Sequence, residues 1–295
     1  MNILLFGKNG QLGTELLRTL SPLGKLTALD RGDADLRDTA QLKRVLTSVA
    51  PDVIVNPAAY TRVDQAEDDR ETAFRVNALA PQTMAEYARY NGSLLVYYST
   101  DYVFDGTKDA PYVETDVPAP INVYGESKWA GEQAVFQQGC HHLIFRTSWV
   151  YSSHGNNFVK TVLRLAREKD SLRVVSDQIG TPTAAELLAD VTALAIAGFF
   201  SDLIPEGTYH LTAAGETSWY GLACRIVEKA LEKKMPLRIG SDDIVPVSTQ
   251  EYPLPARRPL NSRLDTRNLT QKMGFPFPHW TYHLDRVIKR LASVP

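Results

Sequence analysis

The chain has 295 residues, of which 44% are hydrophobic and 22% charged, and its formal net charge at pH 7 is −2. This length allows two lobes that share a large core, and the composition is typical of a soluble globular protein. The near-neutral charge argues against nucleic acid and against an anionic membrane surface as partners.

The start of the chain and its cysteines indicate where the protein works. Residues Met1–Phe6 form a short apolar run without a basic region, too short for a signal peptide or a membrane span. The two cysteines, Cys140 and Cys224, lie far apart and lack the spacing of a metal site. We therefore expect a cytoplasmic protein with reduced thiols.

Short apolar runs alternate with helical patterns through the first half of the chain. The expected buried strands are Ile3–Phe6, Leu26–Leu29, Val53–Val55, Leu94–Tyr98 and Leu143–Phe145. The expected helices between them are Gln11–Leu20, Thr39–Val49, Glu71–Tyr90 and Tyr124–Phe136. This alternation predicts an α/β fold, a doubly wound parallel Rossmann sheet with helices on both faces. Ligands of such sheets bind at the carboxyl ends of the strands.

The second half of the chain has a looser pattern, with prolines clustered in Pro246–Pro259. Loops and short elements suit this composition better than further sheet. We expect a dinucleotide-binding domain at residues 1–146 and a smaller C-terminal domain, mainly for the substrate, at residues 147–295. Segments such as residues 207–232 are candidates for elements that pack with the first domain although they follow residue 146 in the chain.

A glycine-rich loop, Gly7-Lys8-Asn9-Gly10-Gln11-Leu12-Gly13, follows the first strand and opens the first helix. Its glycines permit a tight turn and let the backbone approach a pyrophosphate at the helix N-terminus. Asp30 ends the second strand, where a carboxylate would bind an adenosine ribose and favour NAD. However, Arg31 and Lys8 could pair with a 2′-phosphate, so NADH and NADPH both stay open.

Tyr124 and Lys128 are four residues apart and share one face of a predicted helix. A cation beside a phenol stabilises phenolate and lowers the pKa from about 10 toward the range of a general acid or base. A half-buried tyrosine and a solvated lysine would give the same spacing. The glycine loop makes the catalytic interpretation the stronger one.

Five further segments, together with these features, resemble the dTDP-4-dehydrorhamnose reductases, a family of extended short-chain dehydrogenases/reductases. In family order, they are residues 99–106, 123–128, 145–151, 180–183 and 258–262. The resemblance therefore covers nearly the whole chain. Pro57 and Tyr60 depart from the alanine and histidine of the family pattern, and Tyr60 lies where it would shape the cofactor cleft.

The resemblance implies a reduction of the C4 ketone of dTDP-4-dehydro-L-rhamnose to dTDP-L-rhamnose with NADPH or NADH, for rhamnose-containing cell-surface polysaccharide such as lipopolysaccharide. The cofactor contacts that it implies are Gly7, Gly10, Gln11, Leu12, Gly13, Asp30, Asp35, Leu36, Ala59, Tyr60, Thr61, Tyr98, Tyr124 and Lys128. Tyr124 would deliver the proton, and Lys128 would bind the nicotinamide ribose. The implied substrate contacts are Thr100, Asp101, Tyr124 and Trp149.

Ketone reduction needs a hydride on carbon and a proton on oxygen. Thr100 ends a predicted central strand, so its hydroxyl and the Tyr124 phenol can both point at one carbonyl oxygen. Asp101 is followed by Tyr102, where related nucleotide-sugar dehydratases carry the glutamate of an acid/base pair. The missing glutamate favours net reduction.

Other interpretations remain open. Another nucleotide-sugar 4-ketoreductase or an epimerase would use the same fold, and so would a non-catalytic regulatory subunit of the methionine adenosyltransferase type. Family members can dimerise around Mg²⁺, and Glu15 and Glu186 match the positions of its carboxylates. The resemblance thus also allows a homodimer with a structural metal, although two exposed glutamates on helices, without a metal, fit the sequence slightly better.

Overall fold

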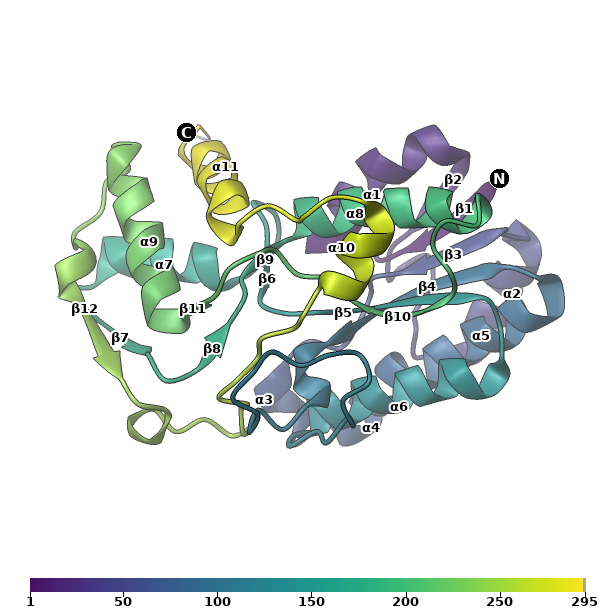
Figure 1. The fold of residues 1–295 in the computed structure, drawn as a ribbon, viewed down its shortest axis with the longest axis horizontal. Helices are drawn as coiled ribbons and strands as arrows, with labels where there is room; N and C mark the ends of the chain where they lie inside the picture. The colour runs from purple at the N-terminus through teal and green to yellow at the C-terminus, as the bar shows by residue number, and fades with distance from the viewer. Residues whose placement is uncertain (294–295) are drawn as a thin grey trace.

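The computed structural model describes residues 1–293. At its centre lies a six-stranded sheet in the order β10-β5-β4-β3-β1-β2, with parallel pairing throughout (Figure 1). The strands are β1 (Asn2–Phe6), β2 (Lys25–Leu29), β3 (Val53–Asn56), β4 (Leu94–Thr100), β5 (His142–Thr147) and β10 (Gly207–His210). The predicted doubly wound fold and its five strands are confirmed. The chain reverses direction across the sheet between β1 and β3, and ligands bind at such a switch point.

Both faces of the sheet are covered by helices. On β1, Ile3 and Leu5 face one core, while Leu4 and Phe6 face the other. The first core receives α1 (Gln11–Leu20) and α8 (Ala185–Phe200), and the second receives α2 (Thr39–Val49), α5 (Ala80–Asn91) and α6 (Val123–Gln138). Each large apolar side chain buried there contributes about 1.5–3 kcal/mol. Burial on both faces explains the uninterrupted apolar runs in the sequence.

The helix predicted at 71–90 is three elements: α4 (Arg70–Phe74), a π-helical turn at Arg75–Leu79, and α5. Pro81 supplies the reason, because it has no N–H to donate to the carbonyl of Asn77. That carbonyl instead accepts a hydrogen bond from the Tyr97 hydroxyl at 2.8 Å. The predicted helical segment is confirmed, but it contains this π turn, which places the Asn77 side chain beside the cleft described below.

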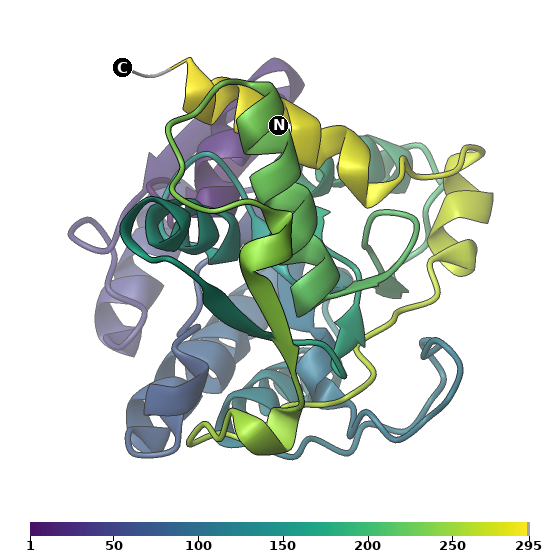
Figure 2. The same ribbon diagram turned by 90° about the vertical axis from the view of Figure 1, so that its left-hand side faces the viewer.

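The second lobe is built from α7 (Phe158–Glu168), α9 (Trp219–Glu232), α11 (Trp280–Ala292) and paired short strands. The pairs are β7 (Leu172–Val175) with β12 (Ile244–Val247), β6 (Val150–Tyr151) with β9 (Thr183–Ala184), and β8 (Ile179–Gly180) with β11 (Thr217–Ser218). In Figure 2, α9 stands in front, with the β7–β12 pair beside it. The remaining helices are α3 (Val63–Ala66) and α10 (Arg267–Met273), with short 3-10 turns at Ser21–Leu23, Asp101–Val103, Ser241–Asp243 and Thr249–Glu251.

Within residues 207–232, β10 joins the main sheet beside β5, whereas α9 packs against α7 and α11 in the second lobe. The helix α8 also lies on the main sheet, against α1. The chain therefore crosses between the lobes more than once after residue 146. The division into domains at 1–146 and 147–295 stays a prediction.

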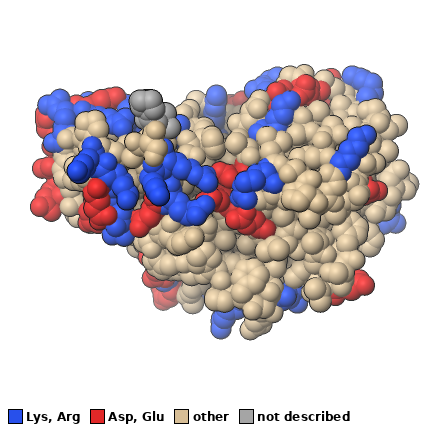
Figure 3. Space-filling model, turned by 90° about the horizontal axis from the view of Figure 1, so that it is seen from above, with Lys and Arg blue, Asp and Glu red and all other residues tan. Residues whose placement is uncertain are grey.

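Seen from above, positive and negative side chains mix at the end that carries α9 and α11 (Figure 3). Side chains of α9 and α11 form ion pairs, such as Lys229 with Glu232 at 2.7 Å and Arg286 with Glu186 of α8 at 2.7 Å. Cys140 and Cys224 are free thiols. Within residues 1–293, no helix is both long and apolar enough to cross a membrane.

Candidate active site

Every residue predicted to hold the cofactor lines one cleft of about 940 Å³. The cleft starts at the glycine loop after β1 and passes the carboxyl ends of β2, β3 and β4. Its inner end is lined by Tyr98, Tyr124 and Lys128. This volume is within the range of small-molecule and cofactor sites.

The glycine loop is compact because backbone atoms approach each other where side chains would stand. Gly7 has φ +68°, and a Cβ on Gly13 would lie 2.0 Å from the Gly7 carbonyl oxygen. The amide of Gly10 donates to the same oxygen at 2.9 Å. Gly10 also ends the turn as the N-cap of α1 without a side-chain hydrogen bond. The first amides of α1 therefore stay available for an anion, and this cradle fits a pyrophosphate.

Acidic and basic side chains alternate at the outer end of the cleft. Asp30 accepts hydrogen bonds from the amides of Asp33 and Gly32, which hold its pKa below the usual value. The Lys8 ammonium lies 2.7 Å from the Asp33 carboxylate and 3.5 Å from that of Asp30. Arg31, in contrast, is largely exposed. This mixture of charges leaves the choice between NADH and NADPH open.

Asn77 fixes the loop after β3, a role that sequence reasoning missed. Its side-chain oxygen accepts from the Tyr60 amide at 2.8 Å, and its side-chain nitrogen donates to the Tyr60 carbonyl at 3.0 Å and to the Ser127 hydroxyl at 2.9 Å. The loop with Ala59, Tyr60 and Thr61 is thus joined to α6. The sequence signal for this role was Pro81, four residues after Asn77, because a proline there interrupts the helical hydrogen bonds.

The start of α6 is pressed against the turn that follows β4. A Cβ on Gly125 would lie 2.1 Å from the Tyr102 carbonyl oxygen, so only glycine permits this approach. Asn122 caps the helix by accepting from the Gly125 amide at 2.8 Å. As a result, Tyr124 packs edge-on against Tyr102, with ring centroids 5.8 Å apart, and lies beside Thr100 at the end of β4.

The structure corrects the expected effect of Lys128 on the Tyr124 phenol. Burial raises the pKa of Tyr124 above 10, and hydrogen bonding with Thr100 offsets only part of this increase. The Lys128 ammonium is bonded elsewhere: it donates to the Tyr98 carbonyl at 2.5 Å and lies 4.1 Å from the centroid of the Tyr97 ring. Tyr124 therefore stays protonated at neutral pH, which is the form that a proton donor needs.

Lys128 itself is almost completely buried. Burial lowers its pKa to about 7, although the neighbouring Glu132 carboxylate favours the charged form. Glu132 is held by Arg146 in a buried ion pair at 2.7 Å. The charge of Lys128 is consequently sensitive to any group that enters the cleft.

Thr100 and Asp101 form a buried pair at the same end. The Thr100 hydroxyl donates to a carboxylate oxygen of Asp101 at 2.9 Å and accepts from the Tyr102 amide at 3.2 Å. Burial raises the pKa of Asp101 to about 6, although the hydrogen bond from Thr100 favours the charged carboxylate. Neither residue lines the cleft, but both are buried and follow Ser99, which does line it, in the chain.

Two hydroxyl groups that sequence reasoning missed line the inner cleft. Ser99 and Thr147 are buried, and within residues 1–293 their side-chain oxygens have no hydrogen-bond partner. The second carboxylate oxygen of Asp101 is in the same situation. Unpaired buried polar atoms of this kind suit a polar ligand. The sequence alone does not give the register of the sheet, which pairs Thr147 with Thr100 and so brings Thr147 to the same end of the strands.

Trp149 does not line the cleft. It has φ +49° and stacks on Trp219, with ring centroids 3.6 Å apart. A Cβ on Gly180 would lie 2.5 Å from its indole ring. The side chain thus packs between two segments of the second lobe, and its contact with a substrate stays a prediction.

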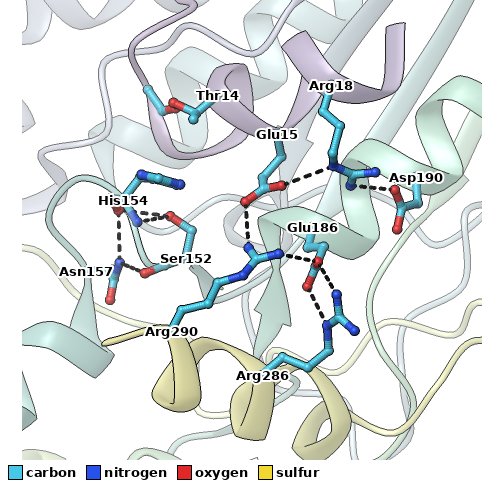
Figure 4. A network of polar contacts seen from close by, with 11 residues as sticks. Thr14, Glu15, Arg18, Ser152, His154, Asn157, Glu186, Asp190, Arg286 and Arg290 are labelled. Carbon is cyan, nitrogen blue, oxygen red and sulfur yellow. Dashed lines mark hydrogen bonds and ion pairs between the residues drawn. The ribbon is translucent and has the colours of Figure 1, made fainter. Parts of the chain in front are cut away.

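Glu15 and Glu186 lie close together, but arginine side chains neutralise them (Figure 4). Arg290 contacts Glu186 at 2.9 Å and Glu15 at 3.4 Å, and Arg286 contacts Glu186 at 2.7 Å. Burial by itself would raise the pKa of Glu186, yet the two guanidinium groups hold it below the usual value. Among residues 1–293, no cluster of three or more His, Cys, Asp or Glu side chains could hold a metal ion. These residues do not fit Mg²⁺, which would lie beside two positive charges.

A doubly wound sheet with a glycine loop at its switch point, and a tyrosine and lysine on one helix at the inner end of the cleft, define an extended short-chain dehydrogenase/reductase. The family model described as "RmlD substrate binding domain" matches residues 1–293. The chain belongs to this family.

Individual relatives agree with this placement. The dTDP-4-dehydrorhamnose reductase of Escherichia coli K12 is 47% identical over 297 residues, covering 99% of each chain. A crystal structure of dTDP-4-dehydrorhamnose reductase from Bacillus anthracis in complex with NADP has a TM-score of 0.88 and 37% identity, covering 98% of each chain. The UDP-glucose 4-epimerase of Thermus thermophilus has a TM-score of 0.82 at 19% identity, a likeness of fold alone.

Proposed function

We propose that the protein is an NAD(P)H-dependent oxidoreductase that reduces the C4 ketone of dTDP-4-dehydro-L-rhamnose to dTDP-L-rhamnose. The observation that carries this proposal is that Tyr124 and Lys128 line the inner end of a cleft that begins at a glycine loop, with the buried Thr100 beside Tyr124. Full-length similarity to dTDP-4-dehydrorhamnose reductases supports the same assignment.

The cofactor would occupy the cleft from the glycine loop to Lys128, and when bound it supplies the hydride. The NADP complex of the Bacillus anthracis relative supports a nicotinamide cofactor. We assign the pyrophosphate to the glycine loop, the adenosine ribose to Asp30, and the nicotinamide half to Tyr98 and Lys128. The proposed contacts between these ends are Asp35, Leu36, Ala59, Tyr60 and Thr61.

The protein positions the ketone and supplies the proton. Tyr124, protonated because burial raises its pKa, donates its phenol proton to the C4 oxygen as negative charge develops there. For Thr100 to donate to the same oxygen, its hydroxyl must turn away from Asp101, to which it donates at 2.9 Å. Lys128, which lines the same end of the cleft, would donate to the hydroxyl groups of the nicotinamide ribose.

The neighbourhood of Asp101 supports reduction over elimination. Tyr102 stands where a dehydratase would carry its glutamate, and its ring packs on Tyr124. A phenol whose pKa burial keeps above 10 is a poor base at neutral pH. Elimination would need a base for the C5 proton of the sugar, and residue 102 supplies no carboxylate for this role.

A panel of nucleotide sugars tests the proposal. Purified protein is mixed with NADPH or NADH and with dTDP-4-dehydro-L-rhamnose, its D-configured 6-deoxy isomer, or a UDP-sugar, and cofactor oxidation is followed by absorbance. We expect rapid oxidation with the L-sugar alone. Folded protein that binds the cofactor but does not turn over this substrate would contradict the assignment. Interconversion of UDP-sugars without net oxidation would point to an epimerase.

A further inference from the structure

A loop of the second lobe, residues 152–157, reaches the glycine loop of the first. Gly155 and Asn156 line the cleft. Gly155 has φ +63°, and a Cβ there would lie 3.1 Å from the Cγ of Gln11. The loop is held in shape by Ser152, whose hydroxyl donates to the His154 carbonyl at 2.8 Å and accepts from its amide at 3.0 Å (Figure 4). It therefore packs directly on Gln11, the first residue of α1.

The side chain of Asn157 joins this loop to Gln11. Its Nδ2 donates to the Gln11 Oε1 at 2.9 Å and to the Ser152 carbonyl at 2.8 Å. Its Oδ1 accepts from the Lys160 amide at 3.1 Å and so caps α7. One end of this amide faces oxygen acceptors, and the other faces an N–H donor. These hydrogen-bond partners therefore determine the orientation of the Asn157 side-chain amide.

The orientation of Asn157 determines that of Gln11. Because Asn157 donates an N–H group, the side-chain oxygen of Gln11 must be the acceptor. The amide nitrogen of Gln11 is then free to donate to another partner. Gln11 lines the cleft at the N-terminus of α1, where free backbone amides favour an anion. If the Gln11 amide were turned around, its oxygen would face that anion and repel it.

We propose that Asn157 is a positioning residue of the cofactor site: by holding the Gln11 oxygen, it keeps the Gln11 amide N–H groups directed at the cofactor pyrophosphate. This inference rests on the proposed function, because it requires a dinucleotide in the cleft. It gives the second lobe a part in dinucleotide binding. Asn157 is also the N-cap of α7, so one side chain both caps this helix and orients Gln11.

The test is a double-mutant cycle on the dissociation constant of NADPH, measured by fluorescence titration without a sugar substrate. Asn157→Ser keeps a good helix cap but is too short to reach Gln11. We expect its Kd to rise about five- to tenfold, the net effect of losing one hydrogen bond. In a Gln11→Ala background the same change should alter the Kd less than about twofold.

Ser218→Ala serves as the control for lost helix capping. Ser218 caps α9 by accepting from the Gly221 amide at 3.0 Å and does not line the cleft, so its loss should lower the Tm without changing the Kd. Equal increases in Kd for Asn157→Ser in both backgrounds, or no increase in either, would overturn the inference.

A second variant covers the case in which Asn157→Ser does not fold. Asn157→Asp keeps the cap but offers only acceptors to Gln11, so the Kd should rise far more in the wild-type background than in Gln11→Ala. Equal effects in both backgrounds would again exclude a role through Gln11. Wild-type protein that binds neither NADPH nor NADH would contradict the proposed function itself.

Discussion

Tyr124→Phe is expected to lower kcat about 10³-fold, within the usual contribution of a general acid. The phenol is the proposed proton donor, and burial keeps it protonated across the neutral range. The ring remains in Tyr124→Phe, so its packing against Tyr102 persists and the Kd of the cofactor should change by less than about threefold. Single-turnover kinetics and a separate cofactor titration distinguish these two quantities.

Tyr102→Phe is the matched control for that experiment. It removes a hydroxyl from the ring that packs on Tyr124, 5.8 Å away between centroids, and leaves the contact between the rings in place. We expect kcat to stay within about threefold of wild type. Comparable losses for Tyr102→Phe and Tyr124→Phe, or near-wild-type turnover by Tyr124→Phe, would show that Tyr124 does not supply the proton.

Lys128→Met is expected to lower kcat/KM about 10²–10³-fold, because the proposed donor to the cofactor ribose is lost together with the positive charge at the inner end of the cleft. Methionine fills a similar volume, so the buried position stays packed. The reaction should be followed at fixed substrate with varied cofactor. Wild-type kcat/KM in this variant would exclude the proposed role of Lys128.

The pH dependence provides a second test of Lys128. Burial lowers its pKa to about 7 in the free protein, so the ammonium form is lost as the pH rises above 7. If the charged form binds the cofactor, the Kd should rise with pH above 7, by up to about tenfold per unit. In Lys128→Met this dependence should disappear. An unchanged pH profile in the variant would assign the titration to another group.

Much of the first lobe can be predicted from local sequence patterns. The predicted bounds of α1 and α2 agree with the structure, because each combines apolar periodicity with a clear start: the glycine loop for α1, and Asp38 accepting from the Gln41 amide for α2. The cleft residues could be placed for a similar reason. They follow strands whose carboxyl ends must meet at one edge of a parallel sheet.

The remaining features depend on contacts between distant segments. The β10 strand adds to the sheet beside β5, and Arg290 reaches Glu15 across nearly the whole chain. The position of the Lys128 ammonium was likewise not predictable from its spacing to Tyr124. It is set by the Tyr98 carbonyl and the Tyr97 ring, which lie on a strand rather than on the same helix.

Transfer of deuterium from cofactor to sugar tests the central claim most directly. The protein is incubated with dTDP-4-dehydro-L-rhamnose and reduced nicotinamide cofactor carrying deuterium at both C4 positions of the ring, and the product is examined by NMR and mass spectrometry. The proposed reduction predicts one deuterium, located at C4 of the rhamnose, with Tyr124→Phe forming the same product more slowly. A product without deuterium, or with deuterium at another carbon, would contradict hydride transfer to the C4 ketone in this cleft.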